Sequence, residues 1–122
     1  MAKDKTDVDP YLRSMMYEAN KQGLVIPLTL YTQSFVVTGY LCTYKTYKKL
    51  LLEIYQERVD EAENQVRMLI EIFDAEHRST DYIHLQRANW ITPYYDPDGP
   101  PWRGRIKDIQ GYIVGIAEED DG

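Results

Sequence analysis

Apolar and polar residues recur along this chain with two different spacings, and each spacing predicts a type of secondary structure. Near the start, four apolar residues share one face of a helix: Leu12, Met15, Met16 and Ala19. Asp9 and Pro10 are residues that commonly begin a helix, and Gly23 is typical of a helix end. We therefore predict an amphipathic helix over residues 10–22.

Strand-like patterns fill much of the rest of the sequence. Alternating apolar positions and many Val, Thr and Tyr side chains predict strands over residues 24–32 and 35–47, joined by a tight polar turn. Gly39 lies inside the second strand, where a glycine indicates a bend, a bulge or a close approach of two backbones. Further strands are predicted over residues 82–92 and 105–116, separated by a loop with four prolines.

The middle of the chain, residues 48–78, allows more than one interpretation. Apolar residues recur every three to four positions and helix formers dominate, so we predict a helix over residues 59–77. Residues 50–56 are either the first turns of this helix or a separate strand. In the second case they compete with residues 82–91 for the place of the third strand. A single long helix over the whole segment, in another type of α+β domain, is the remaining alternative.

Composition limits what kind of protein this is. The chain has 122 residues, 43% of them hydrophobic, which suits one folded domain. Its single cysteine, Cys42, cannot form an internal disulfide and favours a reducing compartment. No apolar run approaches the roughly 20 residues of a membrane helix, and the polar residues 1–8 are predicted to be disordered. We expect a soluble, cytoplasmic protein without a membrane anchor.

The net charge of −6 is unevenly distributed. The tail at residues 117–122 carries −4 and the segment 57–76 carries −5, which leaves +3 for the rest of the chain. The acidic helix over residues 59–77 therefore presents either an ordinary solvated face or a contact surface for a protein partner. The remainder is mildly basic and rich in tyrosine, a residue that suits strands and interfaces.

Two stretches of the sequence carry a family resemblance. In IPLTLYTQSFVVTGYLCTYK, residues 26–45, an apolar strand and a short turn precede a strand with the pattern Gly39-x-Leu41, and Tyr44 follows three residues later. In WRGRIKDIQGYIVG, residues 102–115, an Arg-Gly pair precedes two isoleucines in the pattern I-x-x-I. Both stretches resemble Sm-like proteins, a family that includes the bacterial host factor Hfq.

The Sm-like resemblance implies a mainly β fold with helices, in one domain over residues 1–122. We expect an N-terminal helix followed by a strongly bent, five-stranded Sm-like barrel with a helical insertion at residues 59–80. The resemblance also implies that subunits assemble into a homo-oligomeric ring and bind single-stranded RNA. The acidic residue and the asparagine of the family's uridine pocket are Lys45 and Lys49 here, so RNA binding is predicted to be weak or altered in specificity.

Basic and aromatic side chains at two places are candidates for an RNA site under this resemblance. Bases of single-stranded RNA commonly stack on aromatic rings beside cations that bind phosphate. The candidate residues are Lys45, Tyr47, Lys48, Lys49, Trp102, Arg103 and Arg105. The plainer interpretation is that the lysines protect an exposed strand end and the tryptophan anchors a loop. The alternative function is a structural or protein-interaction module with the same barrel and no nucleic acid.

Motifs for catalysis or cofactor binding are not evident in the sequence. It contains no P-loop, no dinucleotide-binding glycine pattern and no serine-hydrolase elbow. Cys42 has no neighbouring histidine in sequence and suits a small packed side chain. His77 and His84 lack the cysteine or carboxylate pattern of a zinc site. We therefore expect no enzyme activity, no catalytic residue, no metal and no cofactor.

Overall fold

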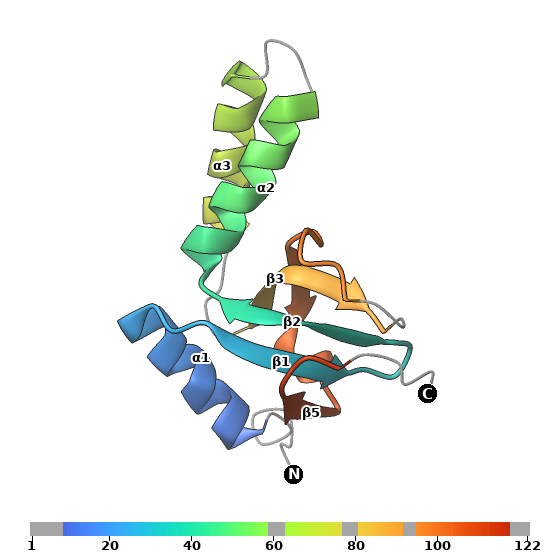
Figure 1. Cartoon of the computed structure of the whole chain (residues 1–122). Helices are drawn as coiled ribbons and strands as arrows, with labels where there is room; N and C mark the ends of the chain where they lie inside the picture. The colour runs from blue at the N-terminus through green and yellow to red at the C-terminus, as the bar shows by residue number, and fades with distance from the viewer. Residues whose placement is uncertain (1–8, 59–62, 77–80, 92–94, 118–122) are drawn as a thin grey trace.

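The computed structural model of this chain describes residues 9–58, 63–76, 81–91 and 95–117. Its elements follow one another (Figure 1) as α1 (Pro10–Gln22), β1 (Ile26–Tyr31), β2 (Val36–Cys42), α2 (Tyr44–Arg58), α3 (Glu63–Glu76), β3 (Tyr82–Trp90), β4 (Trp102–Arg105), η1 (Ile106–Asp108) and β5 (Gly111–Val114). The N-terminal residues predicted to be disordered and the four acids of the predicted tail lie outside the described residues.

The strands form one antiparallel sheet in the order β4-β3-β2-β1-β5. The two edges are β4 and β5, each four residues long, and among the described strands β4 pairs with β3 alone and β5 with β1 alone. The sheet is therefore open and the predicted Sm-like barrel is wrong, because the short edge strands are separated by the turn η1 and do not pair. The coarser expectation, an N-terminal helix and a five-stranded sheet with further helices, is confirmed.

The main core lies between α1 and the sheet. Its buried residues are Leu12, Met16, Ala19, Leu28, Leu30, Val37, Leu41, Ile83, Leu85, Ala88 and Ile106. The predicted ends of α1 are confirmed. Asp9 Oδ1 accepts hydrogen bonds from the backbone N–H groups of Tyr11 (2.8 Å) and Leu12 (3.1 Å), and Gly23 ends the helix in the left-handed conformation with a φ of 69°.

Gly39 lies at a bulge between β2 and β3, in agreement with its position in the sequence. The pairing register shifts between Thr38 and Tyr40, and Arg87 on the partner strand has a φ of 54°. A Cβ atom at Gly39 would lie 2.9 Å from the carbonyl oxygen of Gln86. The strands therefore approach too closely here for a larger residue.

The structure departs from the prediction after Cys42, where β2 ends. The Thr43 hydroxyl accepts a hydrogen bond from the backbone N–H of Thr46 (3.0 Å), so the chain turns directly into α2. The predicted strand over residues 35–47 is therefore too long, and residues 50–56 are helical. The third strand of the sheet is β3.

An antiparallel pair of helices, α2 and α3, projects from one side of the sheet (Figure 1). The helical insertion is larger than predicted, since it begins at Tyr44 rather than at residue 59. Two helices also replace the alternative of one continuous helix. Residues 59–62 and 77–80, which belong to the predicted insertion, lie outside the described residues. In the part of the chain that the structure describes, no helix has the length and apolar character needed to cross a bilayer.

The predicted strand over residues 105–116 is divided in the structure. Strand β4 ends at Arg105, and the 3-10 turn η1 begins at Ile106. The side chain of Ile106 is buried. The backbone N–H of Ile106 donates a hydrogen bond to the carbonyl of Asp81 (2.9 Å), and β5 begins only at Gly111. The turn places the side chain of Ile106 in the core and interrupts the strand.

Candidate protein-interaction surface

The four candidate residues of the first predicted cluster lie on α2 and point in different directions. Lys45 and Lys49 are exposed to solvent. Tyr47 packs on His84 of β3, with ring centroids 4.8 Å apart, and Lys48 turns towards α3. The cluster is therefore divided between the solvent, the sheet and the neighbouring helix.

Arg103 on β4 lies near Tyr47, although the sequence separates these two candidates. The guanidinium carbon of Arg103 lies 3.6 Å from the ring centroid of Tyr82, in a cation–π contact. Burial raises the pKa of Tyr47, and the positive charge of Arg103 counteracts part of that shift. Together with the buried His84, these side chains pack the junction between the sheet and α2. The other histidine, His77, lies outside the described residues.

The second predicted cluster, Trp102, Arg103 and Arg105, lines an open groove of about 580 Å³. The groove runs from the turn between β1 and β2 to the turn η1. Phe35 stands at one side, with its ring centroid 6.2 Å from that of Trp102, and Lys107 adds a further positive charge. The structure therefore does bring these three residues together, in a groove with a mixed aromatic and polar wall.

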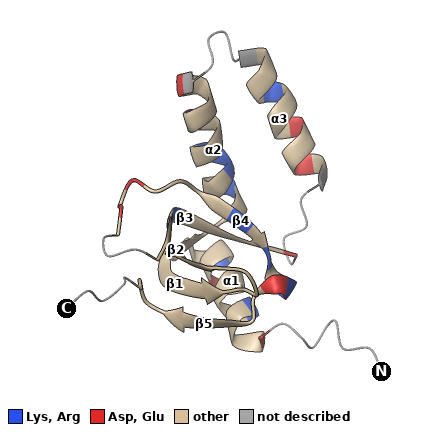
Figure 2. Cartoon of the chain, turned by 90° about the vertical axis from the view of Figure 1, so that its right-hand side faces the viewer, with Lys and Arg blue, Asp and Glu red and all other residues tan. Residues whose placement is uncertain are grey.

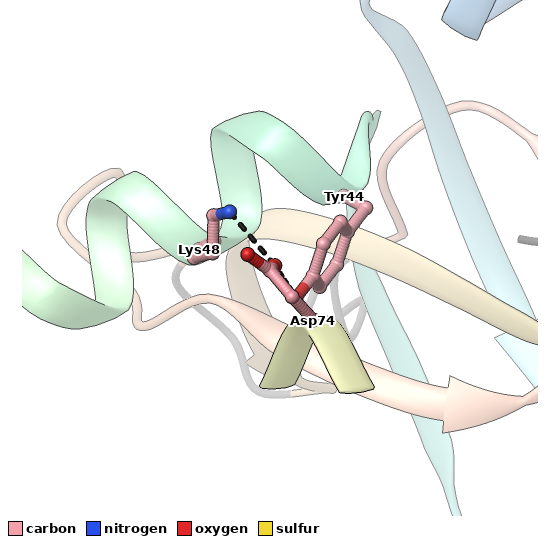
Figure 3. Close-up of polar contacts among 3 residues, drawn as sticks. All are labelled: Tyr44, Lys48 and Asp74. Atoms are coloured by element: carbon pink, nitrogen blue, oxygen red, sulfur yellow. Dashed lines mark hydrogen bonds and ion pairs between the residues drawn. The ribbon is translucent and has the colours of Figure 1, made fainter. Parts of the chain in front are cut away.

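Three residues hold the root of the α2–α3 hairpin (Figure 3). The Tyr44 hydroxyl donates a hydrogen bond to Asp74 Oδ1 at 2.8 Å, and Lys48 Nζ forms an ion pair with the same oxygen at 2.9 Å. Burial raises the pKa of Tyr44 to about 12, with further contributions from the hydrogen bond and the charge of Asp74. These contacts join the first turn of α2 to the last turn of α3.

The hairpin has a small core of its own. Leu52 (9% exposed) and Val66 (8% exposed) pack together between the helices, and three half-buried residues surround them: Tyr55, Leu69 and Ile70. The Tyr55 hydroxyl also forms a hydrogen bond with the Gln65 side chain. This cluster shares no residue with the core under α1. The hairpin therefore has a second, separate cluster, while the start of α2 also packs on β3 through Tyr47.

The side of α3 opposite Val66 is exposed and partly apolar. Met68 is 61% exposed and Ile72 is 53% exposed. Together with the exposed Ala75, they repeat at spacings of four and three residues. On a helix this pattern forms one continuous stripe. We call Met68, Ile72 and Ala75 the outer face of α3.

The sequence contains a signal for this outer face. The apolar stripe that predicts the helix runs through Val66, Leu69 and Phe73, whereas Met68 and Ile72 lie about a third of a turn to one side of it. An apolar pair out of phase with the buried stripe indicates a helix with two apolar sides. The many acidic residues around the pair hide this signal, because they suggest a solvated face.

Comparison with known proteins identifies the family. The family described as "Gas vesicle protein GvpU-like" matches residues 9–117, which is most of the chain. No curated protein and no solved structure matches the chain. The Sm-like resemblance is therefore wrong, and so is the ring-forming, RNA-binding function that depended on it. This chain belongs to the GvpU-like family of gas vesicle proteins.

Proposed function

We propose that this chain is a non-catalytic, gas vesicle–associated protein that works by binding other proteins through its α2–α3 hairpin. Membership of the GvpU-like family supports the association with gas vesicles. The observation that carries the proposal is the outer face of α3, with Met68 and Ile72 exposed on a pair of helices that projects from the sheet (Figure 1). Exposed apolar residues gathered on one element are typical of a contact surface.

The packing of the hairpin suits a contact element. A surface that is ordered before binding loses less conformational entropy when its partner arrives. Asp74 holds the root of the hairpin through Tyr44 and Lys48, and the packing of Leu52 on Val66 holds the two helices together. The hairpin therefore presents Met68 and Ile72 on a preformed support.

Among the described residues, the cysteine and the histidine, which are the side chains best suited to catalysis, are packed away from solvent. Burial raises the pKa of the Cys42 thiol to about 12, so the thiol stays protonated and weakly nucleophilic. His84 is buried against the rings of Tyr44 and Tyr47. These surroundings support a binding role rather than a catalytic one for the described part of the chain.

Flotation with intact gas vesicles tests this proposal, because a protein bound to buoyant particles rises with them. We expect the wild-type chain to float with purified vesicles. A double variant, Met68→Gln with Ile72→Gln, is expected to float at least about tenfold less, since two central apolar contacts each contribute on the order of 1 kcal/mol or more.

The matched control carries Leu24→Gln and Val25→Gln, which replace two aliphatic residues of similar exposure outside the hairpin. This control is expected to float like the wild-type chain, and circular dichroism should show that both variants fold. The proposal is lost if the wild-type chain stays in the liquid below the vesicles. It is also lost if the control loses flotation while the α3 variant keeps it.

A further inference from the structure

We infer that the free edge of β4 binds an extended, acidic segment of another protein, which joins the five-stranded sheet as a further strand. The site is the open groove beside β4, between the turn η1 and the turn that joins β1 to β2. None of the described residues that line this groove belongs to the α2–α3 hairpin, so the inference goes beyond the proposed function. Three features of the groove support it: an unpaired strand edge, exposed aromatic rings and basic side chains.

The main-chain groups on the outer edge of β4 suit a polypeptide partner. In register with the pairing of β4 and β3, the N–H of Ile106 donates a hydrogen bond to the carbonyl of Asp81. Alternate residues of an antiparallel strand bond to the same neighbour, so the N–H and C=O groups of Arg103 and Arg105 point away from β3. No strand that the structure describes pairs with this edge. An extended segment of another chain would supply the matching N–H and C=O groups.

Aromatic rings form one wall of the groove. The ring centroid of Phe35 lies 5.0 Å from that of Trp90 and 6.2 Å from that of Trp102. Phe35 is 39% exposed and Trp90 is 56% exposed. Trp102 also lines a second hollow of about 260 Å³, together with Trp90 and Pro101. Large aromatic side chains are typical anchors of protein interfaces, so this wall offers apolar contacts beside the main-chain hydrogen bonds.

The charges of the groove favour an acidic segment (Figure 2). Arg105 and Lys107 line the groove and are exposed, and neither forms an ion pair with a described residue. Asp108 is the one acidic side chain among the described lining residues. Even without Arg103, whose guanidinium lies on the ring of Tyr82, two positive charges and one negative charge leave +1 here, in a chain with a net charge of −6. Complementary charges select a partner, so carboxylates along the incoming strand fit Arg105 and Lys107.

Two designed peptides test the inference by fluorescence anisotropy with the full chain. One alternates valine with glutamate, and the other alternates valine with lysine. We expect the glutamate peptide to bind at least about tenfold more tightly, although the net charge of −6 alone would attract the lysine peptide. Arg105→Glu with Lys107→Glu should weaken binding of the glutamate peptide at least about tenfold. The matched control, Lys45→Glu with Lys49→Glu, changes the net charge equally at exposed positions of α2 and should weaken binding far less, because salt screens distant charges.

Hydrogen exchange measured by NMR tests the strand pairing itself. Binding of the glutamate peptide should slow exchange of the Arg103 and Arg105 amides at least about tenfold, because their N–H groups gain partners. The Val114 amide is the control. It points outward from β5, the other edge of the sheet, because the neighbouring N–H of Gly115 donates a hydrogen bond inward to the carbonyl of Pro27. Its exchange rate should not change.

Four results would overturn the inference. The first is equal or tighter binding of the lysine peptide. The second is an equal effect of the groove variant and the α2 control on binding of the glutamate peptide. The third is binding without slower exchange of the Arg103 and Arg105 amides. The fourth is binding of the glutamate peptide only after residues 118–122 are removed, which would make the acidic tail of this chain the occupant. These measurements are independent of flotation, so their failure would leave the proposed function standing.

Discussion

Single residues determine several local features of this fold, and Gly39 is the clearest case. The bulge at Gly39 brings the backbone of β2 close to that of β3. A Cβ atom added at Gly39 would lie 2.9 Å from the carbonyl oxygen of Gln86. Asp9 and Gly23 act in the same local way at the two ends of α1. These features were predictable, because each depends on the conformation of a few neighbouring residues.

Replacing Gly39 should therefore be costly. We expect Gly39→Ala to lower the free energy of unfolding by about 1–3 kcal/mol, since the new methyl group meets backbone atoms that cannot easily move. Urea denaturation measures this change. Gly111→Ala serves as the control, because no atom lies within 4 Å of its Cβ position. Equal effects of the two substitutions would contradict the bulge.

The Tyr44–Asp74 contact predicts a shifted tyrosine titration. Burial, and after it the hydrogen bond and charge of Asp74, raise the pKa of Tyr44 from 10.0 to about 12, so its contribution to stability is present below pH 10 and is lost as the pH rises towards 12. In Asp74→Asn the charge is removed, and we expect the pKa of Tyr44 to fall part of the way towards its ordinary value, because the burial of Tyr44 remains. NMR titration of the Tyr44 ring measures this change, with Asp108→Asn as the control. An unchanged Tyr44 pKa in Asp74→Asn would contradict the contact.

Contacts between residues distant in sequence explain why the helical start of α2 and the surroundings of Tyr47 could not be predicted. Tyr47 and Arg103 lie together near His84 only because α2 folds back on β3 and β4. The pattern at residues 44–47 has strand-like side chains, and the contacts of Tyr44 with Asp74 and of Tyr47 with His84 favour a helix there, beside the local contact of Thr43 with Thr46. Such tertiary contacts override local preference.

At the scale of elements, the α2–α3 hairpin is a unit with its own packing. Because its small core is separate from the main core, we expect its amides to exchange independently of the sheet. Leu52→Ala should destabilise the hairpin by about 2 kcal/mol or more, which corresponds to roughly a 30-fold loss of amide protection in α2 and α3.

Hydrogen exchange distinguishes this outcome from a general loss of stability. Amides in β1, β2 and β3 should keep most of their protection in Leu52→Ala. Glu53→Ala, at an exposed position on the same helix, is the matched control and should change little. A uniform loss of protection across sheet and hairpin would show that the two cores unfold together.

For the whole molecule, the sequence predicted the N-terminal helix and a five-stranded sheet, but not that the sheet is open or which family the chain belongs to. The reason is that the residues matching the Sm-like pattern serve packing rather than a particular fold or function. Gly39-x-Leu41 and Ile106-x-x-Ile109 are packing patterns, and the structure uses them for a bulge, for the core and for a turn. At the two positions of the family's uridine pocket this chain has Lys45 and Lys49 instead, and both are exposed on a helix.

On the proposed function, the outer face of α3 touches another gas vesicle protein. A photo-crosslinking residue at position 68, in the full chain and on intact gas vesicles, tests this contact directly. We predict a crosslink from position 68 to a gas vesicle protein, and no comparable crosslink from position 25, which is exposed outside the hairpin. Crosslinks from position 25 but none from position 68 would contradict the account.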